Sequence, residues 1–374
     1  MNLLTVNTGS TSVKLTLFEL GPCDRLVAGP TQQHSVNENP SDVLRGVEQC
    51  GFVPRAIAHR IVHGGDRFAR PARINDEVVT AIDGLSALAP LHNRAALRWV
   101  GAARELWPSA THVAVFDTSF FVDLPRVAAE YAVPTSLGLD HGIRRYGFHG
   151  LAHQAMWQGW CRLRPDLPQG GRLISLQLGG GCSITALQDG RPLDTSMGFS
   201  PLEGLVMATR SGDIDPAIVP HLERQLGVSS EVILSRLNEQ SGLLGLSGTH
   251  DNPAALLADP APQARFAVEL YCYRIRKYVG AFLAVLGGCD GIVFGGGVGE
   301  HVPGVRARAL SGLSWAGISL DPKANEAARG GSACISPARA SVAVHVLAAD
   351  EESVLARAAA ALLTTQDSQM SAAT

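Results

Sequence analysis

The chain contains the same kind of turn twice, as Asn7-Thr8-Gly9-Ser10-Thr11-Ser12-Val13-Lys14 and as Leu178-Gly179-Gly180-Gly181-Cys182-Ser183-Ile184-Thr185. Each turn follows a short apolar run, passes through small residues and leaves on an alternating, strand-like segment. Small residues let backbone N–H groups approach phosphate oxygens closely. One such turn alone is more often a glycine hairpin without a ligand. The repetition therefore predicts two similar halves, each with a phosphate-binding turn.

Length and composition predict a compact protein with two domains. The chain has 374 residues, of which 46% are hydrophobic and 17% are charged, enough to fill two cores. A net charge of -3 and the absence of a Lys/Arg run argue against nucleic acid or an anionic membrane as a partner. No stretch approaches the roughly 20 apolar residues of a membrane span and no secretory leader precedes the first strand, so we expect a cytoplasmic protein.

The cysteines are scattered, odd in number and never arranged as Cys-x-x-Cys. This pattern predicts neither a disulfide framework nor a zinc site. We expect small, buried side chains at Cys23, Cys50, Cys161, Cys182, Cys272, Cys289 and Cys334.

Strands and helices alternate along the chain, as in an α/β protein. Residues 56–63 are typical of a core strand that ends at two glycines, and Thr111–Phe116 is typical of a second strand that ends at Asp117. Open α/β sheets bind ligands at the carboxyl ends of such strands. Helices are expected over residues 91–106, 152–163 and 351–363, with a frayed polar tail after the last.

The composition changes near residues 121–134, where loop residues and prolines replace regular patterns. We place a domain boundary there and expect the last helix to return to the first domain. The prediction is one domain of residues 1–121 plus 350–374 and a second domain of residues 122–349.

Several long motifs follow one another along nearly the whole chain. They are the first turn, residues 7–14, then His59-Arg60-Ile61-Val62-His63-Gly64-Gly65, Ala89-Pro90-Leu91-His92-Asn93, Val115-Phe116-Asp117-Thr118-Ser119-Phe120, Tyr146-Gly147-Phe148-His149-Gly150, Thr195-Ser196-Met197-Gly198-Phe199-Ser200-Pro201-Leu202-Glu203-Gly204, Thr209-Arg210-Ser211-Gly212-Asp213-Ile214-Asp215-Pro216 and Gly295-Gly296-Gly297-Val298-Gly299-Glu300. By these motifs and their order, the chain resembles the acetate and butyrate kinase family, within the superfamily of actin, sugar kinases and heat-shock chaperones. Motifs of this length are far more specific than a glycine pattern.

The resemblance implies a fold and a reaction. The fold is α/β, with two duplicated ribonuclease-H-like (actin-like ATPase) domains around a hinged cleft that closes to exclude water. The reaction is reversible phosphoryl transfer from ATP to acetate, which gives acetyl phosphate and ADP and needs Mg²⁺ or Mn²⁺. The family also suggests a homodimer.

Transfer of a phosphoryl group to a carboxylate needs charge neutralisation and no general base, because the acceptor is already ionised at neutral pH. Arg60 and Arg210 can each present a guanidinium fork to the carboxylate and the phosphoryl oxygens. By resemblance, His149 stabilises the transferring group and His92 helps to position it. Asp117 matches the family's catalytic aspartate, and we interpret it as orienting Arg60 or metal-bound water.

The resemblance also assigns a metal site and an acceptor pocket. Glu351 matches the family's metal ligand, and Asn7 is expected to reach the same ion. Alternatively, the acidic residues there only complement the positive end of the last helix. The positions that line the methyl pocket are Val62, Leu91, Phe148 and Pro201. An apolar pocket discriminates weakly between acids that differ by one methylene, by about 1 to 3 kcal/mol, so propionate is expected to be a slower substrate.

The nucleotide side departs from the family. By resemblance it comprises Ser12, Lys14, Gln177, Leu178, Gly179, Gly180, Gly181, Gly297, Val298, Gly299, Glu300 and His301. Residues 177–181 replace the family's His-Leu-Gly-Asn-Gly, and residues 297–301 replace Gly-Ile-Gly-Glu-Asn. Asn252-Pro253-Ala254 stands where the family has Asp-Phe-Arg, so an arginine that helps to hold the nucleotide is missing.

These departures leave other interpretations open. One keeps the acyl-phosphate chemistry but uses pyrophosphate or another donor. A second is a catalytically silent nucleotide-binding homologue, and a third is an actin-like or chaperone-like switch without a small acceptor. Arg60, His149 and Arg210 together argue against the switch, which would not need all three.

Overall fold

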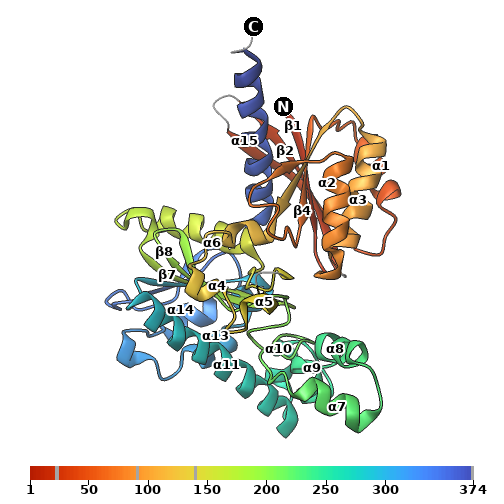
Figure 1. Cartoon of the computed structure of the whole chain (residues 1–374). Helices are drawn as coiled ribbons and strands as arrows, with labels where there is room; N and C mark the ends of the chain where they lie inside the picture. Colours follow the sequence, from red (N-terminus) through yellow and green to blue (C-terminus); the bar gives the residue numbers. More distant parts are fainter. Residues whose placement is uncertain (22–24, 90–91, 139–140, 372–374) are drawn as a thin grey trace. The chain divides into compact units, whose positions relative to one another are not determined.

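The computed structural model describes residues 1–21, 25–89, 92–138 and 141–371, and it divides into two compact α/β units (Figure 1). The first unit consists of Met1–Val122, Phe148–Leu151 and Asp350–Thr374, and the second of Asp123–Gly147 and Ala152–Ala349. Among the described residues, no helix combines the length and the apolar character needed to cross a membrane.

A six-stranded mixed sheet forms the centre of the first unit, with the strand order β3-β2-β1-β4-β6-β5. The strands are β1 (Asn2–Thr8), β2 (Ser12–Leu20), β3 (Leu26–Ser35), β4 (Ala56–Ile61), β5 (Ala72–Arg73) and β6 (Thr111–Phe116). β1 pairs antiparallel with β2 and parallel with β4, and β4 pairs parallel with β6. The parallel strands are buried on both faces, as their apolar runs predict.

The second unit repeats this topology, with the strand order β11-β12-β10-β7-β8-β9. Its strands are β7 (Arg172–Leu178), β8 (Cys182–Gln188), β9 (Arg191–Thr195), β10 (Gly291–Gly295), β11 (Ala333–Cys334) and β12 (Ala343–Val346). β7 pairs antiparallel with β8 and parallel with β10, just as β1 pairs with β2 and β4. The predicted duplication of an α/β fold is confirmed.

Helices pack on both sheets. In the first unit, α1, α2 and α3 cover one face and α15 lies on the other (Figure 1). The helices are α1 (Pro40–Gln49), α2 (Asp76–Gly84), α3 (Asn93–Leu106), α4 (Arg126–Ala129), α5 (Thr135–Gly138), α6 (Gly150–Leu163), α7 (Ile218–Leu226), α8 (Ser230–Glu239), α9 (Gly242–Ser247), α10 (Pro253–Ala258), α11 (Pro262–Leu286), α12 (Gly296–His301), α13 (Pro303–Leu310), α14 (Pro322–Ala327) and α15 (Glu351–Ser371).

The alternation of side chains along β4 decides what faces the site. Ile57 and Ile61 join the apolar clusters under α1, α2 and α3. Arg60 points to the opposite face because successive side chains of a strand alternate. It meets the first turn of α15 there, with Arg60 Nη1 3.3 Å from Glu351 Oε2.

Two expectations need correction. α15 extends to Ser371 and not only to residue 363, because neither glycine nor proline interrupts residues 364–371. The cysteines are not uniformly buried: Cys50 and Cys334 are exposed and Cys161 is intermediate. The other described cysteines are buried, and Cys23 lies outside the described residues.

Candidate functional site

The centre of the candidate site is an arginine held by an aspartate at the ends of two parallel strands. Arg60 Nε donates to Asp117 Oδ1 at 3.1 Å, and Arg60 Nη2 donates to Asp117 Oδ2 at 2.7 Å. β4 supplies Arg60, and Asp117 begins a short 3-10 helix directly after β6. Because the two strands are parallel neighbours, the side chains at their carboxyl ends meet at one edge of the sheet.

Asn7 links this pair to the start of α15. Arg60 Nη1 donates to Asn7 Oδ1 at 3.1 Å, and Asn7 Nδ2 donates to Glu351 Oε2 at 2.8 Å and to Glu352 Oε1 at 3.1 Å. Lys14, on β2, lies with its Nζ 3.8 Å from Glu352 Oε1. Three strands and one helix thus bring four of the predicted residues, Asn7, Lys14, Arg60 and Glu351, to one place.

The cluster is rich in negative charge. Asp117 is fully buried, and the side chains of Glu351 and Glu352 are only 12% and 13% exposed. Burial opposes the positive charge of Arg60, but the carboxylates of Asp117 and Glu351 outweigh it and raise the pKa of the guanidinium. Three carboxylates surround two cationic side chains, so the cluster can accept a further cation.

The loop that carries His149 lies against the same edge. The backbone of His149 hydrogen-bonds to Asp117, and His149 itself has a φ of 57°, in the left-handed region. Gly150 has no room for a side chain, since a Cβ there would lie 1.9 Å from the carbonyl oxygen of Asp117. The glycine after His149 therefore allows this loop to approach Asp117 so closely.

The predicted acceptor residues are divided between the two units. In the first, Val62 and Phe148 are buried, and the Phe148 ring meets the edge of His63 with centroids 5.5 Å apart. His92 directly precedes α3. Pro201 belongs to the second unit, and Leu91 lies outside the described residues.

Arg210, also in the second unit, has surroundings unlike those of Arg60. Its Nη1 donates to the carbonyl oxygen of Pro201 at 3.1 Å and lies 3.8 Å from Met207 Sδ. Across residues 1–21, 25–89, 92–138 and 141–371, no carboxylate forms a salt bridge with it. Burial lowers the pKa of Arg210, since its charge is only weakly compensated. A half-buried guanidinium without a carboxylate partner has the charge and the donors to bind an anion.

Both predicted glycine turns are present as hairpin connections. Gly9 N donates to Ser12 O at 2.8 Å after β1, and Gly179 N donates to Gly181 O at 3.0 Å after β7. A Cβ on Gly180 would meet no protein atom within 4 Å. The fold itself therefore does not require glycine at position 180, and any such requirement would come from a ligand above the turn.

The third glycine motif lies beside the second turn, because β10 is the parallel neighbour of β7. Gly296 has a φ of 75°, and a Cβ there would lie 2.6 Å from Leu178 O. Glu300 Oε1 accepts a hydrogen bond from Gly296 N at 3.1 Å, which closes the first turn of α12. The nucleotide residues predicted at 177–181 and 297–301 are thus neighbours within the second unit.

Arg306 was not among the predicted residues, although it hydrogen-bonds to the backbone of this motif. It is fully buried and donates to Gly299 O at 2.8 Å and to Glu300 O at 3.0 Å, and it also binds Asn325 and Ala328. One signal could have identified it: the arginine occupies an apolar position of α13, four residues before Leu310.

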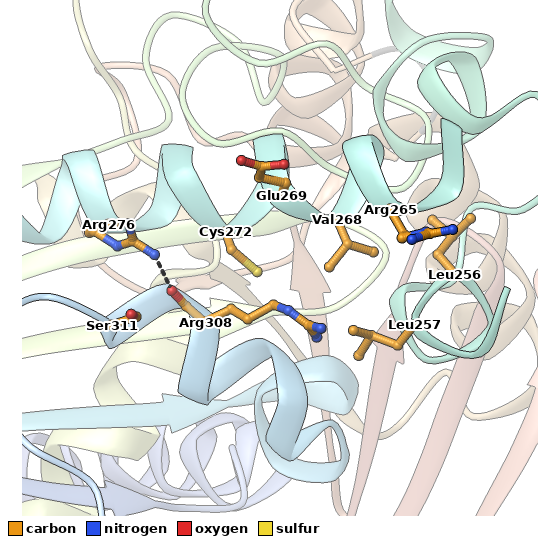
Figure 2. A pocket seen from close by; sticks show the side chains of 9 residues that line it. All are labelled: Leu256, Leu257, Arg265, Val268, Glu269, Cys272, Arg276, Arg308 and Ser311. Atoms are coloured by element: carbon orange, nitrogen blue, oxygen red, sulfur yellow. Dashed lines mark hydrogen bonds between the residues drawn. The ribbon is translucent and has the colours of Figure 1, made fainter. Parts of the chain in front are cut away.

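A separate hollow of about 340 Å³ lies between α10, α11 and α13 (Figure 2). None of the predicted site residues lines it. Arg276 donates to Arg308 O, as Figure 2 shows, and Arg265 donates to Pro260 O. Both guanidiniums therefore hydrogen-bond to backbone carbonyls, and the predicted site residues lie elsewhere.

Comparisons with known proteins agree on one family. Residues 23–357 match the model of the acetokinase family. An acetate kinase of Clavibacter michiganensis is 48% identical over 306 residues, which cover 81% of this chain and 77% of that protein. The crystal structure of Porphyromonas gingivalis acetate kinase superposes with a TM-score of 0.85 at 33% identity, covering 97% of this chain and 99% of that one. A propionate kinase from Francisella tularensis gives a TM-score of 0.85 at 32% identity, with 96% and 98% covered.

Proposed function

The chain belongs to the acetokinase family, and on this premise we propose how its own residues transfer a phosphoryl group between ATP and acetate. It is a phosphotransferase with a carboxyl group as acceptor. The observation that carries the proposed mechanism is the contrast between Arg60, which is fixed by Asp117 and Asn7, and Arg210, which has no carboxylate partner among the described residues.

In the proposed mechanism the two arginines have different tasks. Asp117 holds the Arg60 fork in one orientation, so the guanidinium is preorganised where charge develops on the phosphoryl group. Arg210 offers its uncompensated charge to the acceptor carboxylate and the phosphoryl oxygens. His149 donates to the same oxygens, and no group needs to remove a proton because acetate is already ionised. Acetate oxygen attacks the terminal phosphorus in line, and ADP leaves.

The acidic residues around Asn7 fit Mg²⁺ or Mn²⁺. In the described part of the chain, no three His, Cys, Asp or Glu side chains are placed to hold a metal by themselves. This agrees with Mg²⁺, which takes one or two carboxylates and completes its shell with water and phosphate oxygens. Glu351 and Glu352 would hold the ion, which neutralises phosphate charge when bound. Asn7 turns its Nδ2 toward both glutamates, so we assign it the task of orienting them.

The finer substrate and cellular assignments are also proposals. Val62 and Phe148 are apolar and buried, which suits the methyl group of acetate and admits propionate as a slower substrate. We also propose a cytoplasmic location and, from the resemblance to the family, a homodimer, which sedimentation velocity of the purified protein tests.

A hydroxamate assay for acetyl phosphate tests the reaction. Acetate and Mg²⁺ are incubated in parallel with ATP, GTP and pyrophosphate, with propionate as a second acceptor. We expect turnover with ATP, and slower turnover when propionate replaces acetate. Product with pyrophosphate but not with ATP would overturn the proposed donor, and no product with any donor would overturn the proposed reaction.

A further inference from the structure

A polar cluster in the second unit joins two loop segments. Tyr131 and Arg145 lie in residues 130–147, and Glu203 lies in residues 195–204. The phenol of Tyr131 donates to Glu203 Oε2, and Arg145 Nη2 donates to Glu203 Oε1 at 2.6 Å. Two side chains of one segment therefore occupy both oxygens of a single carboxylate on the other.

The same two side chains hold the second segment at further points. Arg145 Nη1 donates to Ser196 O at 3.1 Å, and Phe199 N donates to the phenol oxygen of Tyr131 at 2.8 Å. The Arg145 guanidinium also lies over the Tyr131 ring, 5.6 Å from its centre. Residues 196, 199 and 203 are thus fixed to one tyrosine and one arginine.

Gly198 shows how closely the segments fit. A Cβ on Gly198 would lie 1.7 Å from Glu203 Oε2 and 2.0 Å from the phenol oxygen of Tyr131. Tyr146 N donates to Gly198 O at 3.0 Å, which adds a backbone contact between the segments. Glycine at position 198 therefore leaves room for the Tyr131–Glu203 hydrogen bond, and any side chain at this position would collide with it.

The segment held in this way carries the acceptor of Arg210. Pro201 lies between residues 199 and 203 in the sequence, and its carbonyl oxygen accepts a hydrogen bond from Arg210 Nη1 at 3.1 Å. Gly204 N donates to Asp213 Oδ1 at 2.8 Å, and Asp213 N donates to Gly204 O at 3.0 Å. Tyr278 of α11 donates to Asp213 Oδ2 at 2.8 Å. The loops before and after Arg210 are therefore tied to each other and to a long helix.

We propose that Tyr131, Arg145 and Glu203 are positioning residues that place the guanidinium of Arg210 for its anion, acting through the carbonyl of Pro201. The inference rests on the proposed function of Arg210. A partly buried ion pair contributes little net stability compared with apolar packing, so a loop is not built around one for stability alone. Such a network does fix geometry, and a displacement of about 1 Å can cost on the order of a hundredfold in rate.

The first test is Tyr131→Phe, which removes one oxygen and keeps the ring. We expect KM for acetate to rise about tenfold and kcat to fall, while KM for ATP and the thermal midpoint stay unchanged. Tyr273→Phe is the matched control, because this tyrosine lies on α11 and is 57% exposed. An unchanged KM and kcat for acetate in Tyr131→Phe would overturn the proposal.

A double-mutant cycle tests the route through Arg210. In an Arg210→Lys background with residual turnover, Tyr131→Phe should have much less effect than in the wild type, because the group it positions is already displaced. Equal effects in both backgrounds would overturn the positioning route while the role of Arg210 stands. Wild-type kinetics in Arg210→Lys itself would overturn that role and the positioning inference with it. Arg145→Lys, which keeps the charge but loses the fork, should reproduce the loss seen with Tyr131→Phe.

Discussion

Arg60 and Arg210 have opposite electrostatic surroundings, although both are proposed to bind the same reacting groups. Arg60, in the first unit, is buried and contacts Asp117, Asn7 and Glu351. Arg210, in the second unit, contacts a backbone carbonyl and a thioether sulfur. The first arginine is therefore part of the folded structure, whereas no carboxylate among the described residues forms a salt bridge with the second.

This difference separates stability from function. Removing Arg60 leaves buried carboxylates without their partner, so the fold and the reaction should suffer together. Removing Arg210 relieves a charge that burial already disfavours, so only ligand binding and turnover should suffer. Variants of the two arginines can therefore confirm or break the comparison.

The largest effect is expected for Arg210→Ala. Turnover should fall by about 10³-fold or more, as when a guanidinium that stabilises phosphoryl transfer is lost, while the thermal midpoint is unchanged or slightly higher. The measurement is steady-state kinetics together with a thermal melt. Arg224→Ala, on exposed α7, is the matched control. Turnover within tenfold of the wild type would show that this charge is not reserved for a reacting anion.

The next effect is on folding, in Arg60→Met. We expect the first unit to lose about 3 to 5 kcal/mol of stability, since Asp117 and Glu351 would keep buried charges without a partner. Urea unfolding followed by hydrogen exchange of β4 and β6 peptides measures this loss. Arg98→Met, on the exposed side of α3, should cost less than about 0.5 kcal/mol. A loss of stability in Arg60→Met as small as in Arg98→Met would mean that Arg60, like Arg210, is not needed for the stability of its unit.

The sequence predicts the first of these environments better than the second. Parallel strands bring their carboxyl ends to one edge, so the strand pattern alone leads us to expect that Arg60 and Asp117 meet. The contact of Tyr131 with Glu203 joins irregular segments that are far apart in the chain, and no periodic pattern marks it. Arg306 is easily missed for a different reason, because an arginine on a helix is normally interpreted as exposed even where it occupies an apolar position.

The fold shows the same limits. The duplicated turns predict the two sheets because each turn connects two apolar strands, and strand patterns are local. The close approach of Gly150 to Asp117 depends on a non-local contact, and so does the packing of Phe148–Leu151 with the first unit. Neither contact has a counterpart in composition or periodicity.

A smaller effect concerns acid stability. Burial lowers the pKa of His59 and His112, whose rings stack and whose Nε2 and Nδ1 are 3.2 Å apart, and it lowers the pKa of His63 to about 4. All three belong to the first unit. Because the unfolded chain takes up these protons near pH 6.5 and the folded unit does not, their stabilisation is complete above that pH and is lost as the pH falls toward the folded values.

We therefore expect the first unit to weaken by up to about 1.4 kcal/mol per pH unit for each histidine between pH 6.5 and 5. The second unit has fewer histidines of this kind among its described residues, with the pKa of His153 lowered to about 3 and that of His345 lowered as well. Hydrogen exchange at pH 7 and pH 5.5 should show greater acceleration in β4 and β6 than in β7 and β10. His112→Gln should reduce the pH slope of the first unit alone. Equal acceleration in both units would contradict this assignment.

The smallest effect on the fold is expected at Gly179, where it tests whether the second unit holds phosphate as its turn suggests. A Cβ there would lie 3.6 Å from Gly181 O, an ordinary contact, and φ is not positive, so Gly179→Ala should leave stability unchanged or raise it by about 0.4 to 1 kcal/mol. Position 179 is glycine in the family pattern as well, whereas position 180 is Asn there. If a phosphate rests on the turn, a methyl group at position 179 lies between it and the backbone N–H groups, and KM for ATP should rise while KM for acetate does not. The matched control is Gly101→Ala on α3, which adds a Cβ in open space without a positive φ. Gly227→Ala at the end of α7 would not serve, because the φ of Gly227 is 63°. An unchanged KM for ATP in Gly179→Ala would mean that the duplicated turn is only a structural hairpin, and the nucleotide would then have to be held by residues 297–301 alone.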